Sequence, residues 1–151
     1  MMNFSIEKMR DEHISAVAQI EKLCFSTPWS ENSLSEELGN SLARFFVLVS
    51  EGAVAGYIGA HNVMGEVYIT NVAIHPDYRK RGFAKALISH LIENCRTEDG
   101  FVTLEVRESN IPAQNLYSAL GFKEVGLRKN FYEHPVEDAV LMTYNYGEGE
   151  V

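Results

Sequence analysis

The stretch HPDYRKRGFAKAL (75–87) surrounds a single glycine, Gly82, with positive charge. Its four cations are Arg79, Lys80, Arg81 and Lys85. The chain as a whole is acidic, with 13 Lys and Arg against 21 Asp and Glu and a formal net charge of -8. Positive charge is therefore concentrated at one short turn, and the residues on either side indicate how the chain folds around it.

Apolar residues follow the glycine at the spacing of one helical face. They are Ala84, Leu87, Ile88, Leu91, Ile92 and Cys95. A helix that starts after a glycine presents free backbone N–H groups and a partial positive charge, which together favour a phosphate. The stretch lacks the G-x-x-x-x-G-K-S/T and G-x-G-x-x-G patterns, so neither a P-loop nor a dinucleotide site is expected. The alternative is a solvated basic turn at a helix start.

The strand before this turn, GEVYITNVAIHP (65–76), changes its side-chain alternation partway along. Val67 and Ile69 share one face, and Val72 and Ile74 share a face whose parity has shifted by one residue. Because strand side chains alternate with a period of two, a β-bulge near residues 70–71 would produce this shift. A strand buried on both faces, in which parity carries little information, is the alternative.

The rest of the chain follows helical and strand patterns in turn, without repeats or linkers. Helices are expected after N-caps at Asp11, at Ser30, and at Ser109 or Asn110. Further strands are expected at 43–50, 53–62, 101–108, 122–132 and 137–146. This order predicts an α/β fold, with a mixed, mostly antiparallel twisted sheet of about six to seven strands and helices on both faces.

Length and composition fit one globular domain, which we place at 1–146, with a disordered acidic tail at 147–151. No apolar run approaches the about 18 residues of a membrane span, and the first residues have no apolar signal-peptide core. Cys24 and Cys95 fall on apolar helical positions, so we expect reduced, buried thiols in a cytoplasmic protein and no metal site. The acidic balance disfavours nucleic-acid binding. It fits a cationic substrate, or serves solubility alone.

The pattern R-x-x-G-x-A, formed by Arg79, Gly82 and Ala84, resembles the acyl-CoA loop of the GCN5-related N-acetyltransferases. Four segments resemble the ribosomal-protein-alanine N-acetyltransferases (RimI-like) of that family: CFSTPWS, NVAIHPDYRKRGFAKALISHLI, LEVRESNIPAQNLYSALGF and RKNFYEHPVEDAVLM. They span most of residues 4–146. The resemblance implies an acetyl-CoA-dependent enzyme, without a metal, that acetylates a protein N-terminal α-amine. The implied acceptor is the N-terminal alanine of a small-subunit ribosomal protein.

The resemblance also implies where acetyl-CoA binds. Its pantetheine arm would pair with the backbone of a bulged strand, here Val72, Ala73 and Ile74, which agrees with the parity shift. Its pyrophosphate would lie on backbone N–H groups of the basic turn, with Arg79 beside them. These groups belong to Lys80, Arg81, Gly82, Phe83, Ala84 and Lys85. Asn110, at the start of a later helix, would also contact the cofactor.

Two side chains match the family's catalytic positions. Glu105, in an otherwise apolar strand, would take the proton of the amine through water. The alternative for this carboxylate is a salt bridge to Arg107, two residues further along the strand. Tyr117 would give a proton to the leaving thiolate, whereas most tyrosines on an apolar helical stripe are core residues.

Three further residues match the family's acceptor groove, namely Pro28, Trp29 and Tyr132. Packing is an alternative explanation for the tryptophan. Phe131 replaces the first member of a tyrosine pair in related sequences, so a hydrogen-bonding role that needs both hydroxyls is in doubt.

Two other functions share most of these features. An enzyme that acetylates a small amine, such as a polyamine or an antibiotic, would differ only in its acceptor groove. A non-catalytic module that binds acyl-CoA would tolerate the loss of Glu105 and Tyr117, and the presence of both favours an enzyme.

Overall fold

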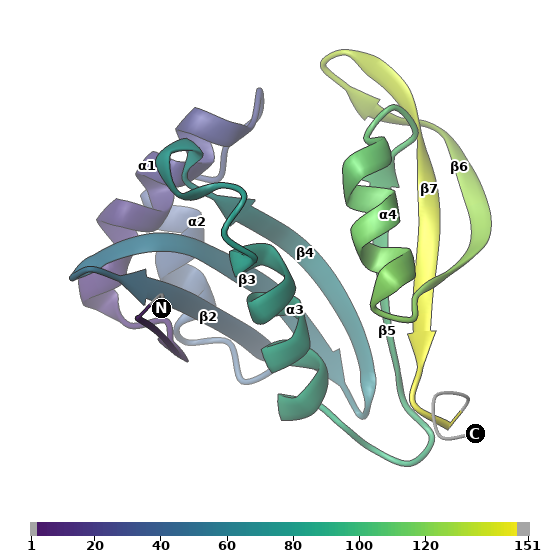
Figure 1. Cartoon of the computed structure of the whole chain (residues 1–151), viewed down its shortest axis with the longest axis horizontal. Helices are drawn as coiled ribbons and strands as arrows, with labels where there is room; N and C mark the ends of the chain where they lie inside the picture. Colours follow the sequence, from purple (N-terminus) through teal and green to yellow (C-terminus); the bar gives the residue numbers. More distant parts are fainter. Residues whose placement is uncertain (1–2, 148–151) are drawn as a thin grey trace.

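A computed structural model describes residues 3–147, and the predicted tail residues 148–151 lie outside the described residues. Within the described part, seven strands form one sheet: β1 (Phe4–Lys8), β2 (Ala43–Ser50), β3 (Ala53–Val63), β4 (Glu66–Ile74), β5 (Phe101–Arg107), β6 (Lys123–Glu133) and β7 (Val136–Asn145). The α-helices of the same part are α1 (Ile14–Cys24), α2 (Glu31–Glu37), α3 (Phe83–Asn94) and α4 (Ile111–Ala119). Figure 1 shows their arrangement.

The sheet has the order β1-β2-β3-β4-β5-β7-β6, and all neighbours are antiparallel except β4 and β5. This parallel pair is short, since Glu66, Val67 and Tyr68 alone pair with residues of β5. Beyond Tyr68 the two strands diverge, and the sheet opens into two halves (Figure 1). The mixed, mostly antiparallel sheet predicted from the order of elements is confirmed.

A β-bulge lies in β4 where the side-chain alternation shifts. Gly59 of β3 pairs with Asn71, but the next residue, Ala60, pairs with Ile69, so Thr70 has no partner across the ladder. Thr70 Oγ1 instead donates a hydrogen bond to the Gly59 carbonyl at 3.1 Å. The bulge predicted near residues 70–71 is confirmed. A bulge bends its strand, which fits the divergence of β4 from β5.

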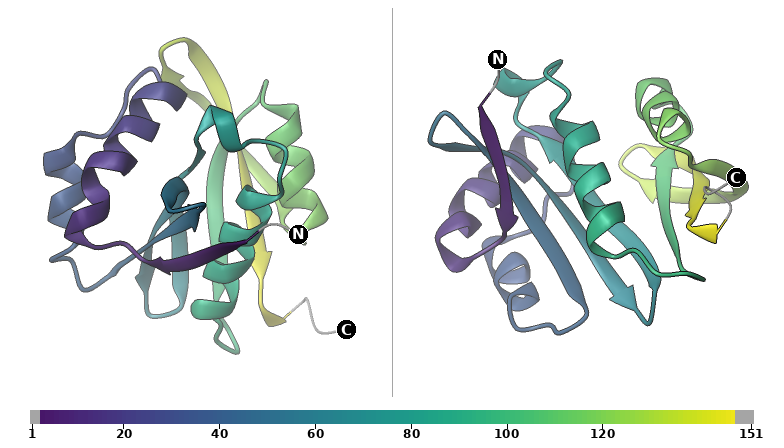
Figure 2. Two further views of the ribbon diagram at one scale, coloured as in Figure 1. Left: turned by 60° about the vertical axis from the view of Figure 1, so that its left-hand side comes forward. Right: turned by 60° about the horizontal axis from the view of Figure 1, so that its bottom comes forward.

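Helices cover both faces of the sheet, as predicted (Figure 2). Phe46 and Leu48 of β2 enter a core with the apolar side chains of α3 and α4. Their neighbours Phe45 and Val47 point the other way, into a second core with α1 and α2. The period-two alternation of one strand therefore serves both cores.

Local expectations at the start of the chain differ from the structure. β1 was not predicted, because FSIEK is short and half-exposed at the sheet edge. The first helix begins as a 3-10 turn, Asp11–His13, so α1 starts at Ile14 and Asp11 is not its N-cap. Ser30 and Asn110 do cap α2 and α4 with their side chains. No helix in the described part of the chain is long and apolar enough to cross a membrane.

Candidate active site

A cleft of about 730 Å³ lies where the two halves of the sheet diverge. Its walls come from the α1–α2 connection, the bulged part of β4, the end of β5, α4 and the β6–β7 turn. Six predicted site residues line it: Trp29, Val72, Glu105, Asn110, Tyr117 and Tyr132. These residues are far apart in the sequence, so the tertiary fold assembles the site.

Ten predicted residues do not line the cleft. Ile74 ends β4, and the seven residues from Arg79 to Lys85 form the basic turn and the start of α3. The other two are Pro28 and Ala73. Pro28 is exposed outside the lining of the cleft, although Trp29 lies within it.

Ala73 is buried. Its backbone groups face β3, because the N–H of His75, two residues further along, donates to the Ala55 carbonyl of β3. The backbone groups of alternate residues in a strand point to the same side. The residues on either side of Ala73 therefore turn their backbone groups toward the open side of β4.

The basic turn ends at the N-terminus of α3, where Gly82 is the N-cap residue with a φ of 79°. A Cβ at Gly82 would meet nothing within 4 Å, so glycine is needed for the backbone angle and not for space. No side chain caps α3 from the described residues, which leaves the first N–H groups of the helix open to a ligand. The Phe83 side chain is buried in the core, so this residue can offer only its backbone.

Arg79 and Cys24 link the basic turn to the end of α1. Arg79 Nε donates to the Ile74 carbonyl and Arg79 Nη2 to the Cys24 sulfur, both at 3.4 Å. Cys24 is half-buried and lines the cleft, so the prediction of a fully buried thiol is wrong here, because α1 ends at this residue. Cys95 is buried as predicted, and burial raises the pKa of its thiol.

Glu105 is buried at the cleft, with 4% of its side chain exposed. Its carboxylate contacts Arg128 Nε at 3.2 Å through Oε1 and accepts a hydrogen bond from the Tyr68 hydroxyl through Oε2. Burial, and then this hydrogen bond, raise the pKa of Tyr68, so its hydroxyl stays protonated and donates. Neither partner was predicted, because the sequence carries no local signal for contacts between these distant strands.

The alternative salt bridge between Glu105 and Arg107 does not form. Arg107 donates instead to the carbonyls of His134 and Pro135, at 3.1 and 3.0 Å. Its guanidinium also lies over the Tyr132 ring, 4.2 Å from the ring centroid. Arg107 is therefore engaged by the β6–β7 turn and holds the Tyr132 side of the cleft in place.

Tyr117 combines the two properties that the sequence left open, since it belongs to the core and also lines the cleft. Its ring packs against Phe122, with ring centroids 5.6 Å apart. Burial raises the pKa of Tyr117 to about 12. The phenol is therefore protonated at neutral pH, where it can donate a proton. Burial also raises the pKa of Tyr132, and the negative charge of Glu105 adds to this effect.

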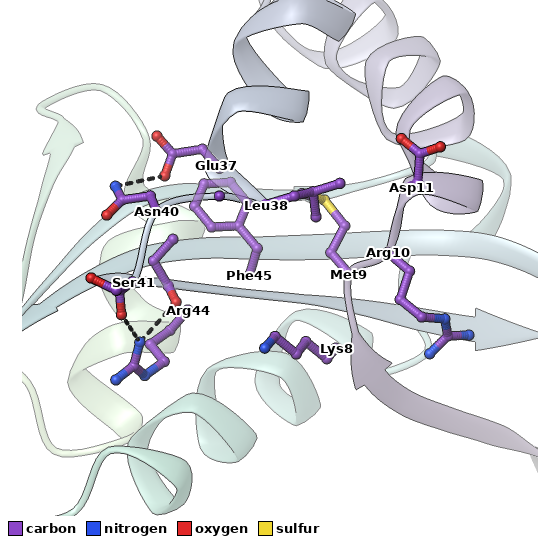
Figure 3. A pocket seen from close by; sticks show the side chains of 12 residues that line it. Lys8, Met9, Arg10, Asp11, Glu37, Leu38, Asn40, Ser41, Arg44 and Phe45 are labelled. Atoms are coloured by element: carbon purple, nitrogen blue, oxygen red, sulfur yellow. Dashed lines mark hydrogen bonds between the residues drawn. The ribbon is translucent and has the colours of Figure 1, made fainter.

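A second hollow, of about 500 Å³, lies beside the start of β2 and holds none of the predicted site residues (Figure 3). Its arginines are engaged within the protein: Arg10 contacts Glu12 at 2.7 Å, and Arg44 donates to the Ser41 carbonyl at 3.0 Å. The glycine turn, Glu105 and Tyr117 all lie elsewhere. We therefore take the cleft between the sheet halves as the candidate active site.

A family model described as Acetyltransferase (GNAT) family matches residues 14–122. This match covers more than half of the 151 residues, and the chain therefore belongs to that family of acetyltransferases. The expected family and fold are thus confirmed.

Two curated relatives cover almost the whole chain. The ribosomal protein bS18-alanine N-acetyltransferase of Escherichia coli (strain K12) is 34% identical over 142 residues, which are 91% of this chain and 95% of that protein. A Bacillus subtilis (strain 168) protein, provisionally named for the same activity, is 39% identical over 146 residues, which are 95% of this chain and 97% of that protein.

Solved structures show the same fold. The crystal structure of the ribosomal-protein-S18-alanine N-acetyltransferase from Escherichia coli matches with a TM-score of 0.87 and 31% identity, covering 95% of this chain and 94% of that one. Arabidopsis thaliana NAA60 in complex with acetyl-CoA matches with a TM-score of 0.82 and 21% identity, covering 95% and 98%. At that identity the second match shows the fold alone.

The glycine turn gives a first testable prediction. Gly82→Val should weaken coenzyme A binding roughly tenfold, because a β-branched residue is strained at positive φ and the N–H groups of α3 would be displaced. Gly82→Asn is the matched control, since asparagine tolerates this backbone region and should retain most of the affinity. Isothermal titration of the two folded variants with coenzyme A measures the difference, and equal affinities would contradict the importance of the backbone angle.

Proposed function

We propose that this chain transfers the acetyl group of acetyl-CoA to the N-terminal alanine of ribosomal protein bS18. Relatives named for this activity are 34% and 39% identical and cover 91% and 95% of the chain. The observation that carries the proposal is that one cleft contains two buried groups suited to proton transfer, Glu105 and Tyr117. A ribosomal acceptor implies an enzyme of the cytoplasm.

The open side of β4 and the start of α3 suit acetyl-CoA. Val72 and Ile74 lie beyond the last β4–β5 pair, and their backbone groups face the side on which a pantetheine arm could add to the strand. The uncapped N–H groups of α3, with Lys80 and Lys85 nearby, suit a pyrophosphate. Asn110 lines the same cleft and would also contact the cofactor.

An N-terminal α-amine is an easier acceptor than a lysine. With a pKa of about 7.7–8.0, roughly a tenth to a fifth of it is neutral near pH 7. A lysine with a pKa of about 10.4 is neutral in fewer than about one molecule in a thousand. A base in the cleft still increases the rate, because the nitrogen must lose a proton as it attacks.

Glu105 and Tyr117 then take opposite parts in the proton transfers. The amine nitrogen forms a bond to the carbonyl carbon of the thioester, and its proton passes to the Glu105 carboxylate through water. The carbon–sulfur bond breaks, and Tyr117 gives its phenolic proton to the thiolate. Arg128 and Tyr68 hold the two oxygens of Glu105 in a fixed orientation. Transfer is direct within a ternary complex, without an acyl-enzyme.

The acceptor class is tested with a panel of amines. We expect thiol release from acetyl-CoA with a basic peptide that starts with a free alanine, and none with spermidine. The same peptide blocked at its N-terminus, with its lysines intact, is the matched control and should be inactive. Release with spermidine alone would support the small-amine alternative. Coenzyme A binding without release from any acceptor would support the non-catalytic alternative.

The base is tested with Glu105→Gln, which keeps the shape of the side chain. At about pH 7 we expect a loss of about a hundredfold or more in kcat/KM for the peptide, as for removal of a general base. The loss should shrink toward about pH 9, where most of the α-amine is already neutral. Glu108→Gln, an exposed carboxylate close to the cleft, is the control and should behave as wild type. A wild-type rate for Glu105→Gln near neutral pH would remove Glu105 from the mechanism.

A further inference from the structure

Glu21, for which no sequence pattern indicated a role, is a fully buried carboxylate in the lining of the cleft. It lies in the last turns of α1. Its Oε1 accepts a hydrogen bond from the backbone N–H of Trp29 at 2.8 Å, and its Oε2 accepts one from the Tyr57 hydroxyl at 2.7 Å. The carboxylate therefore joins α1 to both the α1–α2 connection and β3.

The partners of Glu21 differ in kind from those of Glu105. Glu105 has a cation, Arg128, against its carboxylate, whereas the hydrogen bonds that Glu21 accepts in the described part of the chain all come from neutral groups. A buried carboxylate is costly unless it is well satisfied, and its hydrogen bonds from neutral donors are correspondingly strong. Such a group fixes the geometry of whatever donates to it.

Asn71, in the β-bulge, extends this arrangement to β4. With its amide oxygen toward the indole, Asn71 accepts a hydrogen bond from Trp29 Nε1 at 3.3 Å, and its nitrogen donates to Thr70 Oγ1 at 2.8 Å. Its oxygen also lies 3.2 Å from the Tyr57 hydroxyl, whose one proton is donated to Glu21. The opposite amide orientation offers Glu21 only a contact of 3.4 Å, so the first is better satisfied. Glu21, Tyr57, Trp29 and Asn71 thus form one connected group, which we call the Glu21 quartet.

The Glu21 quartet contacts one wall of the cleft, the segment 25–29, through Trp29, which belongs to both. Farther out, this wall meets the β6–β7 turn through a hydrogen bond from Ser26 Oγ to the His134 carbonyl, at 2.7 Å. That contact is exposed and between neutral groups, so it is easily broken. The opposite side of the cleft is held independently by Arg107. The Trp29 wall is therefore held by the hydrogen bond to Glu21 and by the packing of the Trp29 ring against Phe45, with ring centroids 6.0 Å apart.

We propose that Glu21 is a positioning residue for the acceptor: through the Glu21 quartet it sets the Trp29 wall of the cleft relative to the bulged strand β4. It touches neither the acceptor nor the acetyl group. The inference rests on the proposed acetyl transfer to a peptide, but the position of the wall itself can be measured without any reaction.

The test uses Glu21→Gln in the full chain, with Glu36→Gln as the matched control on the exposed face of α2. In the variant an amide nitrogen replaces one acceptor, so Trp29 N–H or the Tyr57 hydroxyl loses its partner. Trp29 is the single tryptophan of the chain, so its fluorescence reports on the wall directly. We expect Glu21→Gln to shift the emission of Trp29 and to increase its quenching by acrylamide.

The kinetic readout separates positioning from a general loss of structure. For Glu21→Gln we expect the KM of the alanine peptide to rise roughly tenfold, as for a lost hydrogen bond to a charged group, while the KM of acetyl-CoA stays within about twofold. Glu36→Gln should change neither. Unchanged Trp29 fluorescence and unchanged peptide KM would overturn the proposal, as would an equal rise in both KM values.

A second variant keeps the proposal testable if Glu21→Gln does not fold. Tyr57→Phe removes one donor to Glu21 and retains the ring. We expect a smaller increase in Trp29 quenching and a smaller rise in the peptide KM than for Glu21→Gln. Unchanged Trp29 quenching and peptide KM in that variant would then overturn the proposal. If the wild type transfers no acetyl group to any peptide, the proposed function fails, while the fluorescence of Trp29 still decides whether Glu21 holds the wall.

Discussion

The short parallel pairing of β4 and β5 is the constraint on which the rest of the structure depends. The two strands share only the ladder at Glu66, Val67 and Tyr68, and the bulge at Thr70 then bends β4 before a further pair forms. If the pairing continued, the backbone groups of Val72 and Ile74 would form hydrogen bonds with β5. No cleft would then lie between the sheet halves. The divergence leaves the backbone of Val72 and Ile74 unpaired with β5, and it places Glu105 of β5 in the same cleft as Val72.

Most of the confirmed predictions rest on local signals, although the local signal for a cap at Asp11 was wrong, because a 3-10 turn precedes α1. The caps at Ser30 and Asn110, the helix after Gly82 and the parity shift around Thr70 each depend on residues within a few positions of one another. The partners of Glu105 could not be predicted in this way, because Tyr68 and Arg128 reach it from strands distant in the chain. The same limit applies to Ala73, whose backbone direction is set by its ladder with β3.

The roles of the predicted site residues therefore depend on contacts that only the fold supplies. Arg107 was a possible partner of Glu105, but the β6–β7 turn presents carbonyls closer to it. Glu105 and Glu21 are both buried carboxylates of the same cleft, but the groups that contact them differ. The first faces a cation and a phenol at the strand end, which suits proton transfer. The second accepts hydrogen bonds from neutral donors, the Trp29 N–H and the Tyr57 hydroxyl, which suits the support of a wall.

We propose that the open side of β4 and the N-terminus of α3 together hold the cofactor. It is tested most directly by following the backbone amide resonances of the 15N-labelled protein as coenzyme A is added. We predict that the largest shifts fall on Val72, Ile74 and residues 83–85, with little change at Phe45 in the second hollow. Shifts centred on Phe45 and the start of β2, with none at β4 or α3, would contradict it.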